Sequence, residues 1–356
     1  WRAIGGVRGP SGDKAHGLLT EVRSRFDISW PRIAAILAVV AACTLIVAAI
    51  VTRVGSHWFP LQDLAVTDLR VRDVWSTNIP LTGVYSRFGW SHPGPVMYYF
   101  LALFSKLAGG EAWATLVGGA AFQGVGVVWL GFLSWRVGRL PLVLVTMVVT
   151  VLSYASVDAS ILLEPWNPHL VFPWFALFIM YAWRLALAET KRLPGALISG
   201  SVIVQLHVGY VPFLVGAAAM VAAFCVLDLR RGRRWQWSSR SLRLAAASFA
   251  LLWLPVVVDA ILRPPGNLVQ VMKYFTVGSG GEEVTGPAAG LGLLADQFRL
   301  SPDWISGPRL LDVDGSSRPG SAWFILVPLA LMTLGIVAAR RTGIIADRRL
   351  MTIVGG

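Results

Sequence analysis

RFGWSHPGPVMYYFLALFSKLAGG, at residues 87–110, is the stretch that decides how this chain is threaded through a membrane. An apolar run of helix formers, interrupted only by Lys106, follows a polar segment that contains Pro93 and Pro95. Whether or not this run crosses the bilayer decides the side of every later loop. Each of those loops changes sides between the two cases. The side of each loop therefore has to be settled before chemistry is assigned to it.

The composition is that of an integral membrane protein. Of 356 residues, 55% are hydrophobic and only 14% are charged, whereas soluble domains average about 25% charged residues. Cys43 and Cys225 both lie in apolar runs, so we expect neither a disulfide framework nor a thiolate metal site. The net charge of +12 comes largely from basic turns between apolar runs, which favours a lipid bilayer over nucleic acid as the partner.

Eight apolar segments approach the roughly 20 residues that a membrane-spanning helix needs. They lie at about residues 33–53, 113–135, 140–160, 168–187, 193–208, 211–228, 244–262 and 322–339. The basic turns between or after them contain Arg136 and Arg139, Lys191 and Arg192, residues 230–234, and Arg340 and Arg341. The pattern predicts an all-α polytopic integral membrane protein with about eight spans.

The positive-inside rule orients these spans. With a cytoplasmic N-terminus, every basic turn falls on the cytoplasmic side, provided that residues 94–108 do not cross the membrane. We therefore expect that run to be a juxtamembrane or re-entrant helix on the outer face. The protein is expected to be a multi-pass protein of the plasma membrane.

The same topology divides the chain into three parts. We expect a cytoplasmic tail at residues 1–32, a transmembrane module at 33–340 and a cytoplasmic segment at 341–356. Within the module, residues 54–112 form a first outer loop with juxtamembrane helices, and residues 263–321 form a long outer loop. Because the chain begins with Trp1 and not Met, we expect it to be a piece of a longer polypeptide.

Polar chemistry collects on the outer side in this topology. The histidines expected there are His57, His92, His169 and His207, and acidic residues gather in the same loops. We take the extracytoplasmic side as the functional one.

Two acids lie on one predicted amphipathic helix in the first outer loop. Asp63, Thr67 and Arg70 share a face by spacing, and Asp68 is placed to pair with Arg72. The apolar positions expected to rest on the membrane are Leu64, Val71 and Trp75. Two interpretations stay open: an interfacial helix with ordinary ion pairs, or a carboxylate held over an outer cavity as a general base.

A cation and an imidazole flank two aromatic residues before the opening helix. Arg87 and His92 enclose Phe88 and Trp90, and aromatic residues at that depth are common in membrane proteins. A guanidinium and an imidazole just above the start of a helix are nevertheless suited to receive a phosphate.

The second outer loop is bent by Pro165 and Pro168. Trp166, Asn167 and His169 therefore lie on a rigid bend beside the outer face. A capped turn, with Asn167 as N-cap and Pro168 at the first helical position, explains this sequence without a ligand. A substrate cavity lined by these residues is the alternative.

The segment around His207 predicts a broken helix inside the membrane. From Leu193 to His207 a helix rises about 21 Å, which is short of the roughly 30 Å hydrocarbon core. Gln205 and His207 are thus expected below the outer surface, beside a break at Gly209. An ionisable group at that depth is a candidate functional residue, and a histidine hydrogen-bonded between helices is the alternative.

Two of these segments resemble a known family. SHPGPVMYYFLALFSKLAGGE, at 91–111, is similar to the segment in glycosyltransferases of the GT-C superfamily in which a His-Pro-Pro motif opens a juxtamembrane helix. QDLAVTDLRVRDV, at 62–74, looks like the acidic first-loop motif of that superfamily. Gly94 stands where the family carries the second proline, and Asn167 stands where many members carry Asp.

The resemblance implies a GT-C-like helical bundle and an inverting transfer of a sugar from a polyprenyl-phosphate donor to a glycan or glycolipid acceptor of the cell envelope. It implies Asp63 as general base, with Asp68 as second choice. The residues expected to bind the donor phosphate are Arg70, Arg87, His92 and His207, and those expected to line the substrate cavity are Trp90, Trp166, Asn167, His169 and Gln205.

Cofactor and substrate identity are less constrained. The sequence contains no HExxH or Cys-rich metal motif, so it assigns no particular cofactor, and a divalent cation stays open. The Ala, Val, Gly and Arg richness is typical of a high-GC bacterium such as an actinomycete, for which arabinose or mannose on a decaprenyl carrier are reasonable sugars. Two other functions compete: a transporter or flippase for the same lipids, and a non-catalytic scaffold subunit of a cell-envelope complex.

Overall fold

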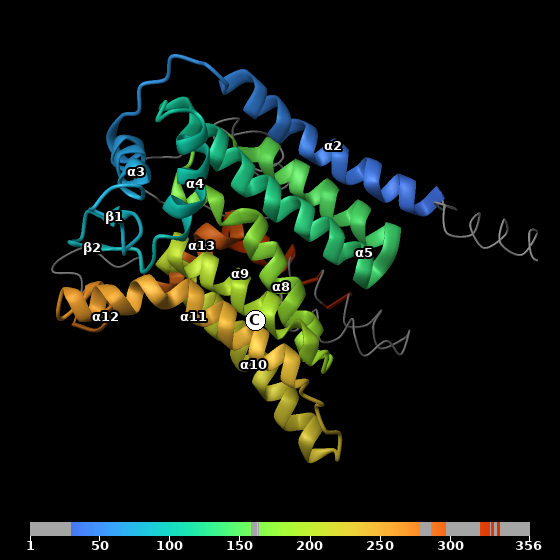
Figure 1. Cartoon of the computed structure of the whole chain (residues 1–356). Coiled ribbons are helices and arrows are strands. Elements are labelled where there is room, and N and C mark those ends of the chain that lie inside the picture. The colour runs from blue at the N-terminus through green and yellow to red at the C-terminus, as the bar shows by residue number, and fades with distance from the viewer. Residues whose placement is uncertain are drawn as a thin grey trace, which may run out of the picture.

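The computed structural model describes residues 30–157, 162, 164–277, 286–296, 321–327, 329–330 and 333–334. Within these residues the protein is helical apart from one short hairpin, β1 (Tyr85–Ser86) paired antiparallel with β2 (Trp90–Ser91). Figure 1 shows the helices as a bundle with smaller elements gathered at one end. Residues 1–29 of the expected tail, the segment at 341–356, and most of the long loop at 263–321 past residue 277 lie outside the described residues, whereas residues 30–32 belong to the first helix.

The α-helices of the bundle and its ends have the following bounds. They are α2 (Trp30–Arg53), α3 (Gln62–Asp73), α4 (Val96–Leu107), α5 (Trp113–Val157), α7 (Asn167–Leu170), α8 (Phe172–Ala186), α9 (Leu193–Leu206), α10 (Val211–Arg230), α11 (Ser239–Leu262), α12 (Asn267–Val277) and α13 (Pro287–Asp296). The 3₁₀ helices are η1 (Thr190–Arg192), η2 (Val208–Tyr210) and η3 (Ser321–Ile325).

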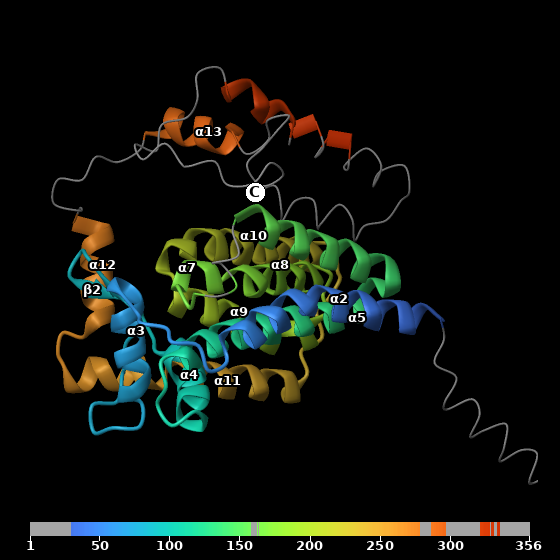
Figure 2. The same cartoon turned by 90° about the horizontal axis from the view of Figure 1, so that it is seen from above.

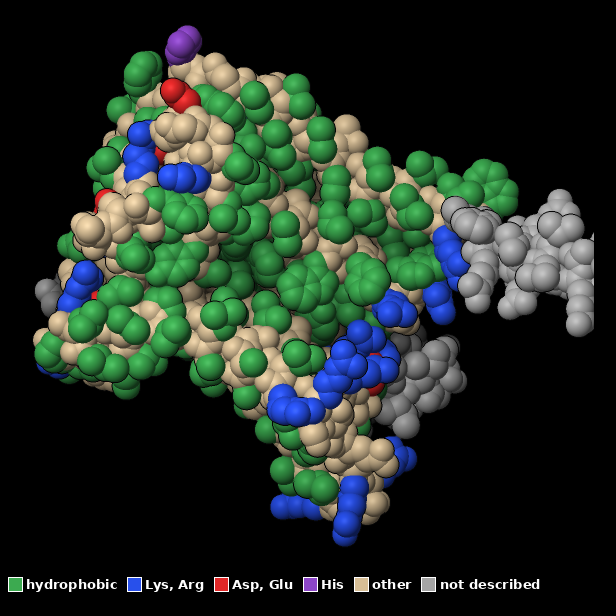
Figure 3. All heavy atoms as spheres, viewed as in Figure 1, with side chains coloured by type: hydrophobic (Ala, Val, Ile, Leu, Met, Phe, Trp, Pro, Cys, Tyr) green, Lys and Arg blue, Asp and Glu red, His purple; other side chains and the backbone are tan. Residues whose placement is uncertain are grey.

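Five segments are long and apolar enough to cross a membrane among the described residues. They are Trp30–Arg53, Trp113–Ala155, Asn167–Ala186, Val208–Arg230 and Ser239–Leu262. In four of them only 6–22% of the most apolar window is buried in the protein, whereas 67% is buried in Asn167–Ala186. Apolar helices that leave so much of their surface uncovered suit a lipid surrounding, and the green surface in Figure 3 follows their flanks. The chain is an all-α membrane protein.

Helix α5 covers two of the expected spans. Arg139 interrupts it with a non-helical backbone (φ 56°, ψ −152°), and Pro141 follows two residues later. The two halves run antiparallel beside α2, as Figure 1 shows. The basic turn expected between the spans at 113–135 and 140–160 is therefore a tight reversal at Arg139.

Helix α4 is too short to cross a bilayer. Its 12 residues rise about 18 Å, against roughly 30 Å of hydrocarbon. Helix α2 ends and α5 begins at the same end of the bundle in Figure 1, so the chain between them makes no crossing. This agrees with the expectation that residues 94–108 lie beside the bundle and do not span the membrane.

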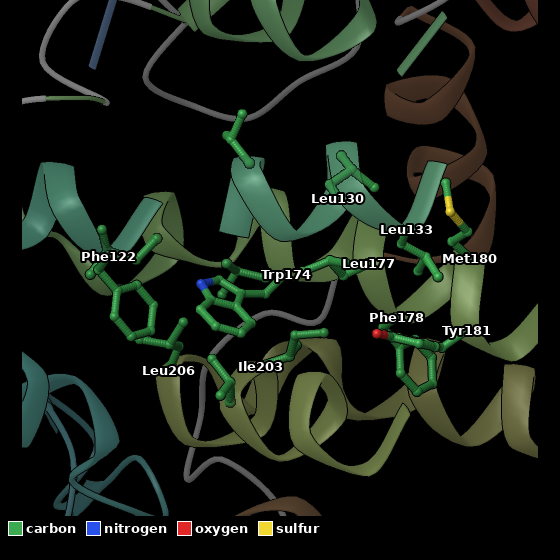
Figure 4. Packing of buried hydrophobic residues seen from close by; sticks show 14 of the residues in the cluster. Phe122, Leu130, Leu133, Trp174, Leu177, Phe178, Met180, Tyr181, Ile203 and Leu206 are labelled. Atoms are coloured by element: carbon green, nitrogen blue, oxygen red, sulfur yellow. The ribbon is translucent and has the colours of Figure 1, made fainter. Parts of the chain in front are cut away.

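The core lies where α5, α8 and α9 meet. Phe122, Trp174, Ile203 and Leu206 point toward one another there (Figure 4), and each is at most 5% exposed. On the same interface the Trp129 indole N–H donates to the Tyr181 hydroxyl at 2.7 Å. Helix α8 is the central helix because it contacts α5, α9 and α10 together.

The two ends of the bundle differ in character. Figures 1 and 2 place α3, the hairpin, α12 and the start of α4 together, and we call this the hairpin end. The larger group of Lys and Arg side chains lies at the opposite end (Figure 3). That basic end is built by the α8–α9 and α10–α11 turns, in which Glu189 pairs with Arg184 and Arg192, and the Thr190 hydroxyl donates to the Gln236 carbonyl.

Two expectations for single residues were wrong. Val71 was expected to rest on the membrane, but it is fully buried, because α3 turns that face onto the protein. Asn167 was expected to cap α7, but Trp166 holds the N-cap position and the Asn167 amide donates to the Leu206 carbonyl at 2.8 Å instead. In both cases a contact with a distant part of the chain replaces the local one.

Candidate functional site

Two histidines, His92 and His207, lie next to each other at the hairpin end, where helix α9 ends. His207 follows the last residue of α9 with an extended backbone, so the helix ends two residues before the break that the sequence predicts at Gly209. The His92 and His207 rings lie 4.9 Å apart between centroids. The loop before α4 and the break after α9 therefore meet at this histidine pair.

Backbone donors fix the protonation of both rings. The Val208 N–H donates to His92 Nδ1 at 3.1 Å, and the Gly209 N–H donates to His207 Nδ1 at 3.2 Å. Because both Nδ1 atoms accept, a neutral ring carries its proton on Nε2. Each histidine is thus set to donate through Nε2.

Burial keeps His92 neutral. It lowers the pKa of His92 to about 3, with the nearby His207 acting in the same direction. Near pH 7 the His92 ring is therefore not a fixed cation. A bound anion would meet two Nε2–H donors and would itself favour protonation of the rings.

Gln205 connects the end of α9 to the start of α4 and to α11. Its Oε1 accepts from the Val96 N–H at 3.3 Å, and its Nε2 donates to the Leu252 carbonyl at 2.8 Å. A Cβ atom at Gly94 would lie 2.3 Å from that Oε1. Glycine is therefore required where the resembled family has proline, because the Gln205 side chain occupies the space.

Asn167 ties the second loop to the same place. Its amide holds the carbonyl of Leu206, the residue before His207. His169 packs edge-on against the exposed Trp166 at 4.7 Å, and its buried Nδ1 has no hydrogen-bond partner among the described residues. Trp90 is buried and lies 5.4 Å from the His92 ring.

The two acids of α3 have different surroundings. Asp68 is 4% exposed, and its two oxygens accept from Arg72 Nε at 2.8 Å and from the Thr115 hydroxyl at 2.6 Å. The ion pair that the spacing predicts is present, and the bond to Thr115 fastens α3 to α5. Asp63 is exposed in the first turn of α3.

Helix α4 carries a tyrosine, Tyr98, whose hydroxyl is affected by Asp63. This tyrosine was not among the site residues predicted from the sequence. Burial raises the pKa of Tyr98, Arg70 lowers it, and Asp63 raises it. The hydroxyl thus lies within the electrostatic reach of both charged groups. Arg70 itself pairs with Asp73 at 3.0 Å, so its charge is shared with a carboxylate on its own helix.

Arg87 lies on the exposed hairpin turn. Its guanidinium stacks on the Phe88 ring at 4.9 Å. Phe88 in turn stacks on Tyr274 of α12 at 4.9 Å between centroids. This arrangement orients the Arg87 side chain along the aromatic surface of the hairpin.

An apolar groove of about 590 Å³ runs between α4 and α11. Its walls are Leu81, Pro95, Val96, Tyr99, Phe100, Leu103, Leu251, Leu252, Leu254, Pro255 and Val258, and Gln205 lines it as well. The groove thus reaches the residue that holds the start of α4. The groove therefore ends at Gln205, two residues before His207 along the chain.

No group of three or more His, Cys, Asp or Glu side chains suited to a metal is found in the described part of the chain. Comparisons with protein-family models, with curated proteins and with solved structures found no match to this chain. The class of protein defined so far is therefore a helical membrane protein with a polar site at one end of its bundle.

Proposed function

We propose that this protein is a membrane glycosyltransferase of GT-C-like architecture with about eight spans. It transfers a sugar from a polyprenyl-phosphate donor to a glycan or lipid acceptor of the cell envelope, with the hairpin end on the extracytoplasmic side. The observation that carries the proposal is the meeting of the apolar groove and the polar end of α9 at Gln205. An amphiphile with a long apolar tail and an anionic head requires such a combination.

The groove suits the tail of the donor. Its lining is aliphatic and aromatic apart from the Gln205 amide and the Tyr99 hydroxyl, which donates to the Pro80 carbonyl at 2.7 Å. A few isoprene units buried there would contribute about 25 cal/mol per Å² of apolar area removed from water. The rest of a long polyprenyl chain would continue into the bilayer.

The histidine pair suits the phosphate. Both rings have Nδ1 occupied by backbone donors, which leaves the Nε2–H groups for phosphate oxygens. A dianionic or monoanionic phosphate would raise the pKa of both histidines. The two histidines would then be positively charged only while the donor is bound. This charge would strengthen their hydrogen bonds to the phosphate of the leaving group.

Asp63 is the proposed base. It would take the proton of the acceptor hydroxyl while the oxygen attacks the anomeric carbon, and polyprenyl phosphate would leave with the electron pair of the broken C–O bond. Attack opposite to the leaving group inverts the anomeric centre. Asp68 is less suited, because Arg72 and Thr115 occupy its oxygens, whereas Asp63 is exposed.

A flippase for the same lipids is the second candidate. A broken helix beside an open groove also serves a protein that moves a lipid head past the bilayer, and α9 and η2 form such a break. The two functions differ in their products: a flippase moves an intact lipid, whereas a transferase releases polyprenyl phosphate and a glycosylated acceptor.

The test fills the groove. Val258→Trp, which places an indole on a lining residue, should abolish both the binding of a photoactivatable polyprenyl phosphate and the transfer of labelled arabinose or mannose from synthetic polyprenyl donors. Val257→Trp is the matched control, because Val257 is 53% exposed and is not part of the lining. Equal binding and transfer by the two variants would refute the groove as the donor site.

A further inference from the structure

A second pocket, of about 250 Å³, lies beside the hairpin and apart from the apolar groove. We call it the hairpin pocket. It is lined by Thr82, Tyr85, Gly89, Trp90, Ser91, Asp259, Arg263, Asn267 and Gln270. The first five residues come from the hairpin and its approach, and the last four come from the end of α11 and the start of α12, which lie beside each other in Figures 1 and 2.

Hydrogen bonds hold the two walls together. The Ser91 N–H donates to Asn267 Oδ1 at 2.7 Å, and Asn267 Nδ2 donates back to the Ser91 carbonyl at 2.7 Å. The Asn267 N–H donates to Asp259 Oδ2 at 2.8 Å. Asn267 and Asp259 are 9% and 3% exposed, so these bonds are shielded from water and the pocket is rigid before any ligand arrives.

The pocket contains a charged pair, Arg263 and Asp259, whose two side chains are not joined by a direct hydrogen bond. Arg263 Nη1 lies 3.6 Å from Asp259 Oδ1, with the Arg263 side chain 52% exposed. That separation is long for a direct hydrogen bond. Guanidinium N–H groups and a carboxylate oxygen are therefore placed for hydroxyl groups that can both donate and accept.

Aromatic rings complete the lining. Trp90 is 6% exposed, and its buried Nε1 has no hydrogen-bond partner among the described residues. Tyr85, on the paired strand of the same hairpin, is 60% exposed and offers a ring face.

We propose that the hairpin pocket binds a single sugar ring, an inference that rests on the proposed function and specifies where its carbohydrate lies. A sugar presents an apolar C–H face to aromatic rings and a rim of hydroxyls to mixed donors and acceptors, which is the combination found here. The volume is below the about 300–1,000 Å³ typical of pockets for drug-sized ligands, so it suits one ring and excludes a larger glycan portion. An anion alone would be opposed by Asp259.

The sugar has two sources, since it can belong to the donor or to the acceptor. The chemistry of the ring is the same in both cases. Competition distinguishes them: a sugar of the donor would be displaced by polyprenyl-phosphate-sugar, whereas the terminal sugar of an acceptor would bind together with it.

The experiment uses the full chain purified in detergent. Methyl glycosides of arabinofuranose, mannose, glucose and galactose are titrated, and binding is followed by saturation-transfer difference NMR. At least one glycoside should bind to the wild-type protein. Gln270→Ala and Tyr85→Ala should each weaken that binding about 3- to 10-fold, the cost of one lost ligand contact of about 1 kcal/mol.

Lys273→Ala is the control, because Lys273 is exposed on the same helix and lies outside the pocket lining. It should change the dissociation constant by less than about twofold. Absence of binding by every glycoside, or equal binding by all three variants and the wild type, would overturn the inference. Glycoside binding without any sugar transfer would uphold the hairpin pocket while refuting the proposed transferase.

Discussion

Substitution of Gly94 by alanine tests the packing that joins α4 to α9. A Cβ atom there would lie 2.3 Å from Gln205 Oε1, 2.4 Å from its Cδ and 2.8 Å from its Cγ. The Gln205 side chain is held at both ends, by the Val96 N–H and by the Leu252 carbonyl. It therefore cannot move aside without giving up those hydrogen bonds.

The expected cost follows from these contacts. Overpacking of a filled site costs about 1–3 kcal/mol, and each of the two hydrogen bonds contributes about 0.5–1.5 kcal/mol. Gly94→Ala should thus lower the free energy of unfolding by about 2–6 kcal/mol. Gly216→Ala is the matched control, because no atom lies within 4 Å of a Cβ at Gly216 and alanine favours a helix by about 0.5–1 kcal/mol.

A double-mutant cycle isolates the clash. The free energy of unfolding is measured in detergent by chemical denaturation for the wild type, Gly94→Ala, Gln205→Ala and the double variant. If Gln205 is the obstacle, Gly94→Ala should cost at least about 1 kcal/mol less in the Gln205→Ala background. Equal costs in the two backgrounds would refute this account of why glycine occupies the position.

Three further predictions concern the acids and the histidine pair. Asp63→Asn should eliminate sugar transfer while polyprenyl phosphate still binds, because a carboxylate base contributes about 10²–10⁴-fold in rate; transfer near the wild-type rate would remove Asp63 as base. Asp68→Asn should lower the free energy of unfolding by about 1–3 kcal/mol and reduce transfer less, since Asp68 holds Arg72 and Thr115; unchanged thermal stability would contradict this. His92 has its pKa lowered from 6.5 to about 3 by burial and by its neighbour, so the unfolded chain binds a proton that the folded protein does not. The contribution of His92 to the free energy of unfolding should therefore be constant above about pH 6.5 and fall by about 1.4 kcal/mol per pH unit between about pH 6.5 and pH 3, and His92→Gln should remove this part of the measured slope.

The sequence predicts those features that depend on local spacing. The Asp68–Arg72 pair follows from a separation of four residues on a helix, and a helix break close to His207 follows from Gly209, although the helix ends two residues earlier than predicted. The tight reversal at Arg139 follows from a basic turn between two apolar runs. These features are set within one or two helical turns, so the pattern of residues contains them.

Contacts between distant segments could not be predicted in this way. The Asn167 side chain was predicted to cap its own helix. Its amide instead donates a hydrogen bond to the Leu206 carbonyl, 39 residues further along the chain. The hairpin pocket escaped notice because Asp259 and Arg263 belong to the end of an apolar helix, and nothing in their spacing points to residues 82–91. Trp90 was noted for the substrate cavity, but the unpartnered indole nitrogen is visible only in the folded protein.

The bond between Asn267 and Ser91 has a consequence for biosynthesis. The Asn267 side chain gives and receives one hydrogen bond each with the Ser91 backbone, as a neighbouring strand would. A hairpin of two-residue strands has little stability of its own, and its amide partner is 176 residues further along the chain. A ribosome that adds about 5–20 residues per second needs on the order of 10–35 s to cover that distance. During this interval the hairpin is already made while α11 and α12 are still to come, so the rim of the site can close only after both helices have been synthesised.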